Sequence, residues 1–335
     1  MMVHYEKNEI AIRFQEDYFF EEQRKNKDGF LVCRLFFGKQ DREISSQDRL
    51  IQMRTIIMGI KSKSNKIYEY SVEKNDVFDL FKADCSLQDF AHSVYKQDSL
   101  ILTGGSDMIT IGKSNQNWLF KADKEQENER LNLNKINLPP FNVKRFKHCQ
   151  CIIRDHLFVF FGYRDQFSFS ETIEWLDLRK LKDGANLKFT EIELKGEDKF
   201  FVQPMIFQIE DQELDLFDRL VADDPFKDRI YLFGGKSSKQ GRRSFKNSLC
   251  HLFELEISWD KVTGGPLFGE VIESPLLGRK TFQGQPSFSQ NVPNKKYYPN
   301  LKTWVFLDDE GGQHTLNLAT KEVGYQDIRH IRKLP

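Results

Sequence analysis

Residues 229–256, RIYLFGGKSSKQGRRSFKNSLCHLFELE, hold the clearest structural signal in the chain. The apolar run at 230–233 stops at Gly234 and Gly235, which lack the side chains that would oppose a turn with positive φ. After a polar stretch, one set of alternate residues over 249–256 is apolar except for His251, the period of a strand with two differently buried faces. The stretch therefore predicts two strands joined by a long loop.

Related patterns recur on both sides of this stretch and divide into five units. Each unit supplies about four short strands over roughly 45 to 75 residues, a spacing typical of the blades of a β-propeller. One small sheet leaves both of its faces open, and radial packing of several sheets would bury them. The clearest strands are predicted at residues 10–14, 30–37, 55–59, 67–72, 77–81, 118–122, 173–178, 189–194, 203–207, 269–272, 303–307 and 314–318.

Composition predicts a folded protein with a sizeable core. The chain has 335 residues, of which 39% are hydrophobic, and 30 of its residues are Phe. Its 50 basic and 50 acidic residues cancel to a net charge of +0, which disfavours nucleic acid as a partner. The five Cys residues have no regular spacing, so we expect no disulfide framework and a reducing compartment.

Targeting signals are weak at the start of the sequence. Residues 1–14, MMVHYEKNEIAIRF, contain no long apolar run, and charges interrupt every later apolar run before it could cross a bilayer. Acidic residues at 6, 9, 16 and 17 argue against a transit peptide. We therefore expect a cytoplasmic protein without membrane insertion, and import into an organelle is disfavoured but left open.

The repeated features identify a family resemblance. His92 precedes LILTGG at 100–105, His148 precedes LFVFFG at 157–162, and aromatic residues at 68, 118 and 175 recur in the third strands of their units. On these features, and on the two glycine pairs, the chain resembles the kelch-repeat β-propellers over about residues 50–325. The pattern is degenerate, because Gly162 stands alone where the third unit should have a pair.

The resemblance implies an all-β, kelch-like β-propeller in one domain, residues 1–335. Six blades are favoured, with five or seven as alternatives. The strands at 10–14 and 30–37 would complete a blade with the C-terminal hairpin and so close the ring.

The strongest metal-like cluster is His148, Cys149 and Cys151. Tetrahedral zinc takes about four ligands, and packing explains the two Cys residues more simply because alternate residues of a strand share a face. The sequence contains no G-x-S-x-G, P-loop, G-x-G-x-x-G or H-E-x-x-H motif. We therefore expect no metal, no cofactor and no catalytic residue.

The predicted loops carry the candidate interaction residues. Residues 208–228 form an acidic insertion, expected as a loop or a short amphipathic helix whose apolar face either covers a blade edge or docks on a partner. The loop after Gly235 is basic, and residues 294–300, NKKYYPN, combine basic and aromatic side chains suited to an interface. The candidate partner-binding residues are Lys236, Lys239, Arg242, Arg243, Phe245, Lys246, Lys295, Lys296, Tyr297, Tyr298, Leu214 and Phe217.

Kelch proteins resemble one another in architecture and differ in partner, so the resemblance implies a binding scaffold with no specific ligand. We expect a noncatalytic structural subunit of a multi-protein complex, with the cytoskeleton or a cilium as the setting that analogy suggests. The alternatives are a substrate-receptor propeller of a ubiquitin ligase and an enzyme with an axial active site. A receptor would usually bring a separate N-terminal oligomerisation domain, and residues 1–50 are short and strand-like for one.

Overall fold

A computed structural model describes much of the chain. The described residues are 30–37, 52–59, 66–71, 76–82, 90–96, 98–107, 112–113, 116–122, 133–164, 168, 170, 172–182, 187–193, 201–202, 205–208, 227–233, 236–237, 246–247, 251–275, 277, 296–307 and 312–327. The chain divides into two compact units, Met1–Pro140 and Phe141–Pro335, and each is described by itself. A single propeller domain over residues 1–335 stays a prediction, and most of the acidic insertion at 208–228 lies outside the described residues.

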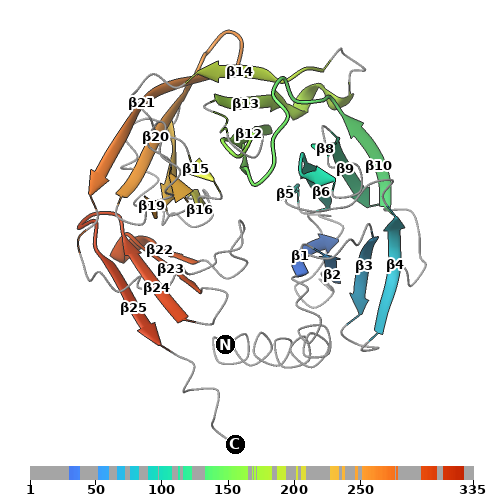
Figure 1. The fold of residues 1–335 in the computed structure, drawn as a ribbon, viewed down its shortest axis with the longest axis horizontal. Helices are drawn as coiled ribbons and strands as arrows, with labels where there is room; N and C mark the ends of the chain where they lie inside the picture. Colours follow the sequence, from blue (N-terminus) through green and yellow to red (C-terminus); the bar gives the residue numbers. More distant parts are fainter. Residues whose placement is uncertain are drawn as a thin grey trace, which may run out of the picture. The chain divides into compact units, whose positions relative to one another are not determined.

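Regular structure in the described residues is β, apart from two short 3-10 helices, η1 (Leu178–Lys182) and η2 (Pro299–Leu301). The expected all-β class is therefore confirmed. The strands form antiparallel sheets, and five of these sheets have four strands among the described residues (Figure 1). We number them sheet 1 to sheet 5 in chain order. A sixth four-stranded sheet, which six blades require, would have to include strands from outside the described residues.

The first unit contains sheets 1 and 2. Sheet 1 has the order β1 (Phe30–Phe37), β2 (Gln52–Gly59), β3 (Lys66–Ser71), β4 (Asp76–Lys82). Sheet 2 consists of β5 (Ala91–Tyr95), β6 (Ser99–Thr103), β9 (Asn117–Ala122) and β10 (Leu133–Leu138), and a small pair, β7 (Ser106–Asp107) and β8 (Gly112–Lys113), lies between β6 and β9 in the sequence.

One expected pairing is wrong. Residues 30–37 were expected to complete a blade with the C-terminal hairpin, but they form β1, which pairs with β2 along its whole length, from Phe30 opposite Gly59 to Phe37 opposite Gln52. The four C-terminal strands form a sheet of their own. The other strand in that expectation, at residues 10–14, lies outside the described residues.

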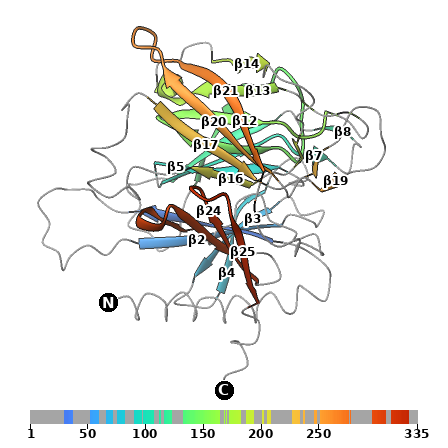
Figure 2. The same ribbon diagram turned by 90° about the vertical axis from the view of Figure 1, so that its left-hand side faces the viewer.

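The second unit contains sheets 3, 4 and 5. Sheet 3 has the order β11 (Cys149–Ile153), β12 (His156–Phe160), β13 (Thr172–Asp177), β14 (Thr190–Glu193). Sheet 4 has the order β16 (Met205–Gln208), β17 (Lys227–Phe233), β20 (His251–Trp259), β21 (Pro266–Pro275), with β17, β20 and β21 side by side in Figure 2. Sheet 5 has the order β22 (Lys296–Tyr298), β23 (Thr303–Leu307), β24 (Gly312–Asn317), β25 (Val323–Asp327). A small sheet joins β15 (Phe201–Val202), β18 (Lys236–Ser237) and β19 (Lys246–Asn247).

Strand β17 of sheet 4 is buried on both faces. In β17, Ile230 and Leu232 belong to a core shared with sheet 3, whereas Tyr231 and Phe233 belong to a core shared with sheet 5. Successive side chains of a strand point to opposite faces, so an unbroken apolar run is what a strand between two cores requires. The first prediction is confirmed here, because β17 and β20 pair as a hairpin across a long connection.

The glycine pairs mark a backbone turn of positive φ. Gly104 and Gly105 follow β6 with φ of 62° and 96°, and at the matching place after β12, Phe161 and Gly162 have φ of 54° and 94°. Phe161 thus adopts the conformation of the missing first glycine. Gly234 and Gly235, after β17, lie outside the described residues.

Candidate interaction sites and buried polar clusters

The candidate partner-binding residues fall unevenly on the structure. The residues that lie outside its described part are Leu214, Phe217, Lys239, Arg242, Arg243, Phe245 and Lys295. Lys236 and Lys246 lie in β18 and β19, whose pairing joins the two ends of the basic loop as a small hairpin. Lys296 is the first residue of β22. The binding role of these residues stays a prediction.

The neighbouring tyrosines Tyr297 and Tyr298 have different environments. Tyr297 is 7% exposed and its ring centroid lies 5.1 Å from that of Trp304, inside the core shared by sheets 4 and 5. Tyr298 is 40% exposed. Because Tyr297 is buried in the core, Tyr298 offers the larger surface to a partner, and the expectation of a two-tyrosine anchor is corrected to that extent.

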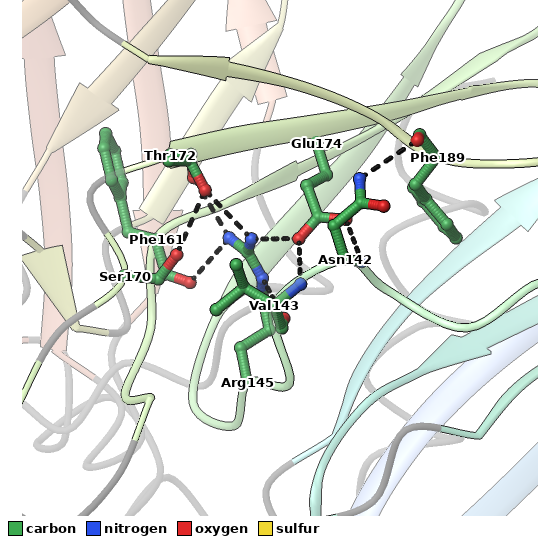
Figure 3. A network of polar contacts seen from close by, with 8 residues as sticks. All are labelled: Asn142, Val143, Arg145, Phe161, Ser170, Thr172, Glu174 and Phe189. Atoms are coloured by element: carbon green, nitrogen blue, oxygen red, sulfur yellow. Dashed lines mark hydrogen bonds and ion pairs between the residues drawn. The ribbon is translucent and has the colours of Figure 1, made fainter.

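Within the described residues, an extensive polar cluster surrounds Arg145, which precedes β11 and is fully buried (Figure 3). Its Nη1 donates to the carbonyl oxygens of Phe161 (3.2 Å) and Thr172 (3.0 Å), and its Nε donates to that of Val143 (3.2 Å). Its Nη2 donates to Thr172 Oγ1 (3.2 Å) and forms an ion pair with Glu174 Oε1. All five donors of the guanidinium are thereby used.

Glu174, on β13, is also fully buried and completes the cluster. Its carboxylate accepts hydrogen bonds from the backbone N–H groups of Asn142 (2.8 Å) and Val143 (3.1 Å), as well as from Arg145. The Asn142 side chain donates to the Phe189 carbonyl at 3.0 Å. Desolvation of the Arg145 guanidinium lowers its pKa, and the adjacent Glu174 carboxylate opposes that shift. This cluster holds the segment that enters sheet 3 against β13, and its hydrogen-bonding groups are occupied by the protein itself.

A second cluster joins sheets 3 and 4 around His156. His156 Nδ1 donates to the Arg154 carbonyl (2.7 Å) and Nε2 faces Arg179 Nη2 (3.2 Å), so the ring is neutral and accepts at Nε2. Burial lowers the pKa of His156, and the hydrogen bond from Arg179 lowers the pKa of Asp177. Arg179 Nε and Nη2 lie 2.8 and 2.9 Å from the two Asp177 oxygens.

A charged pair extends this cluster. Arg154 Nε lies 2.7 Å from Asp228 Oδ2, which also accepts from Trp259 Nε1 at 2.6 Å. The Arg154 guanidinium stacks over the Trp259 ring at 5.3 Å. These contacts join the β11–β12 turn to β17 and β20, which is a packing role.

The Cys and His residues that resembled a metal site are buried. Cys149 and Cys151 belong to the core shared by sheets 3 and 4, which confirms that they pack on one face. Burial raises the pKa of the Cys149 thiol, and burial lowers the pKa of His148 and of His92, the latter to about 3. Among the residues that the structure describes, no group of three or more His, Cys, Asp or Glu side chains could hold a metal ion.

Sequence reasoning missed the exposed apolar residues at one end of sheet 5. Leu277 is 58% exposed and Leu301 is 64% exposed. Neither belongs to a periodic pattern, because Leu301 ends a 3-10 turn and Leu277 lies beyond the end of β21. Their distinguishing feature is the set of hydrogen bonds to their backbones, which the sequence does not reveal.

Comparison with known proteins returned neither a matching family model nor a matching curated protein. Within the described part of the chain, none of the helices is both long and apolar enough to span a membrane.

Proposed function

We propose that this chain is a noncatalytic protein-interaction scaffold, a structural subunit of a larger assembly, built from kelch-like propeller blades. The observation that carries the proposal is the stacking of sheets 3, 4 and 5 through two successive apolar cores. Propeller blades pack in this way, with each central sheet covered on both faces by its neighbours.

The blade count belongs to this proposal. Each of the five sheets is an antiparallel meander of four strands, in the chain order that propeller blades have. The described strands therefore support five blades more directly than six. The turn of positive φ after β6 and after β12 supports the kelch resemblance, because the kelch glycine pair lies at this point.

The buried ionisable groups support a noncatalytic role. Arg145 and Glu174 direct their polar atoms at the backbone of Val143, Phe161 and Thr172. Both ring nitrogens of His156 are likewise hydrogen-bonded, one to the Arg154 carbonyl oxygen and the other to the Arg179 guanidinium. Groups that hold connections in place in this way are not poised for proton transfer. A cytoskeletal or ciliary setting is part of the proposal by analogy alone.

Purification at native abundance tests the proposal. The tagged chain is expressed at its normal level, isolated under mild conditions and analysed by size-exclusion chromatography with mass spectrometry. We expect it to elute with a fixed set of other proteins in constant ratios, well above its own mass of 39.6 kDa. Elution as a free monomer across several extraction conditions would contradict the scaffold role.

A further inference from the structure

The imidazole ring of His156 lies where sheets 3 and 4 meet. The side chain is 1% exposed, and the ring centroid is 4.8 Å from that of Trp259 on β20 and 5.5 Å from that of Trp175 on β13. Nδ1 donates to the Arg154 carbonyl, so Nε2 is the ring atom that can gain a proton. A change at Nε2 therefore acts on the contact between the two sheets.

Arg179 joins the Nε2 atom of His156 to the carboxylate of Asp177. Arg179 Nη2 lies 3.2 Å from Nε2, and the guanidinium also donates to both Asp177 oxygens. Nε2 itself lies 4.0 Å from Asp177 Oδ1, which is beyond hydrogen-bond distance. His156 and Arg179 are thus placed to compete for one carboxylate, and the neutral ring leaves that carboxylate to Arg179.

The same guanidinium reaches the β20–β21 turn of sheet 4. Arg179 Nη2 donates to the Gly264 carbonyl oxygen at 3.4 Å, and a Cβ added at Gly264 would lie 3.1 Å from Arg179 Nη1. The turn is ordered by its own hydrogen bonds, from Gly264 N to the Asp260 carbonyl (2.8 Å) and from Asp260 N to the Gly265 carbonyl (2.9 Å). Arg179 therefore holds an ordered turn of sheet 4 against sheet 3.

Protonation of His156 changes which group the Asp177 carboxylate prefers. The imidazolium offers no acceptor to Arg179 and carries the same charge, whereas its new N–H group and the carboxylate attract each other. The Arg179 side chain is 44% exposed, so water can solvate its guanidinium once it leaves the carboxylate. The His156 side chain is nearly inaccessible to water and has no such alternative. The carboxylate therefore passes from Arg179 to the protonated ring.

The pH range of this exchange lies below neutrality. Burial lowers the pKa of His156 from 6.5, so the ring takes a proton only as the pH falls below that value. The hydrogen bond from Arg179 lowers the pKa of Asp177 from 3.8, so its carboxylate is still charged when the ring is protonated. The other charged groups that the structure describes beside the ring and its tryptophans are Arg154, Asp155, Lys180 and Asp228. Two are basic and two are acidic, so Asp177 and Arg179 decide the outcome.

We propose that this arrangement is a pH-sensitive switch: when His156 gains a proton, its Nε2–H group binds the Asp177 carboxylate, Arg179 leaves that carboxylate, and the β20–β21 turn is released from sheet 3. The proton comes from solvent, and no bond between heavy atoms forms or breaks. The apolar core shared by sheets 3 and 4 takes no part in the exchange, so the chain stays folded while the turn loosens. This inference goes beyond the proposed scaffold role and does not depend on it.

The test is hydrogen–deuterium exchange of the full chain with mass spectrometry, with rates corrected for the intrinsic effect of pH. From about pH 7.5 to about pH 4.5, protection of residues 260–265 should fall about fivefold, and that of the β24–β25 turn should stay unchanged. His156→Gln keeps an acceptor for Arg179 but cannot gain a charge, so the turn should stay protected throughout. Arg179→Gln should give the low protection at every pH. Lys180→Gln is the matched control and should behave like the parent chain, because Lys180 is 60% exposed and lies 3.7 Å from Asp177 Oδ2.

Four outcomes overturn the inference. They are protection of the β20–β21 turn that does not change with pH in the parent chain, an equal loss in the His156→Gln variant, a pH response that persists in the Arg179→Gln variant, and a loss at both turns together with the circular dichroism of the folded chain, which would mean that acid unfolds the whole molecule. If His156→Gln does not fold, the Arg179→Gln variant decides. None of these outcomes bears on the scaffold proposal, which purification of the assembly tests separately.

Discussion

Phe161 occupies a backbone position that glycine fills in the second sheet. Its φ of 54° lies in the left-handed region, which costs a non-glycine residue on the order of 1 kcal/mol. The side chain is fully buried in the core shared by sheets 3 and 4, and burial of a phenylalanine contributes about 2 to 3 kcal/mol. Packing therefore outweighs strain at this residue.

Gly162, unlike the position of Phe161, has no room for a side chain. A Cβ added there would lie 2.7 Å from the Phe146 carbonyl oxygen and 2.9 Å from the His148 nitrogen, and φ is 94°. Because two of the three nearest atoms are backbone atoms and the third is the His148 Cβ, we expect Gly162→Ala to lower the free energy of unfolding by about 2 to 4 kcal/mol in urea denaturation. Gly269→Ala is the control, since its Cβ would meet no atom closer than 3.4 Å, and it should change the same quantity by less than about 1 kcal/mol. Equal effects would contradict the assigned turn.

The Arg145–Glu174 pair should show strong coupling. Arg145→Met leaves the Glu174 carboxylate buried without its ion-pair partner, so we expect a loss of about 3 to 5 kcal/mol in the free energy of unfolding. Glu174→Met alone should be similarly damaging. The double variant should lose clearly less than the sum of the two single variants, because no uncompensated charge remains. Additive losses in a double-mutant cycle would show that the two groups do not depend on each other.

Burial of His92 predicts acid sensitivity. Its pKa falls from 6.5 to about 3 in the folded chain, so the unfolded chain binds a proton that the folded chain does not. The stability contribution is complete above pH 6.5 and is lost as the pH falls toward 3, by up to about 1.4 kcal/mol per pH unit. His92→Asn should flatten the stability profile in this window and leave its slope unchanged above pH 7. If the stability of the variant and of the parent chain changed in parallel with pH, His92 would not have the lowered pKa.

At the scale of single elements, β17 is the strand that meets two cores. Leu232 faces sheet 3 and its neighbour Phe233 faces sheet 5, and both side chains are buried. We expect Leu232→Ala and Phe233→Ala each to lower the free energy of unfolding by about 2 to 5 kcal/mol. A half-exposed strand would make one of the two changes nearly neutral, as expected for Leu267→Ala on the exposed side of β21. If either Leu232→Ala or Phe233→Ala left the free energy of unfolding nearly unchanged, burial of β17 on both faces would be refuted.

Sequence predicted the strands well because their signal is local. The predicted ranges 30–37 and 303–307 match β1 and β23 at both ends, and alternation separated the two faces of β20. Partner choice between strands was harder. The C-terminal partner assigned to residues 30–37 came from the family's ring closure, whereas the observed pairing with β2 follows the nearest strand in the chain.

The candidate site was only partly predictable for a similar reason. Composition drew attention to Tyr297 and Tyr298, but which of them faces the core depends on the register of β22 against β23. Arg145 gave no signal, because a single arginine in a connecting segment looks like a solvated charge until five acceptors surround it. The position of Leu301 likewise depends on a hydrogen bond that the Asn317 side chain donates to its carbonyl oxygen, and Asn317 is distant in the sequence.

At the scale of the whole molecule, the shared sheet should couple the cores of the second unit. In a Trp118→Phe, Trp304→Phe background, fluorescence reports on Trp175 and Trp259, beside the core of sheets 3 and 4. Phe306→Ala, in the other core, should lower the thermal midpoint that these tryptophans report, because sheet 4 belongs to both cores. Leu267→Ala should leave it unchanged. An unaltered midpoint in the Phe306 variant would mean that the cores melt independently.

The burial of β17 on both faces also has a consequence for synthesis on the ribosome. Trp259, the last buried residue of the core shared with sheet 3, leaves the ribosome before Leu318, the last buried residue of the core shared with sheet 5, and about 60 residues separate them. At roughly 5 to 20 residues per second, Tyr231, Phe233 and Leu252 remain uncovered for about 3 to 12 s. Chaperones that recognise aromatic surface have that interval to bind the nascent chain, and slow translation of sheet 5 would lengthen it.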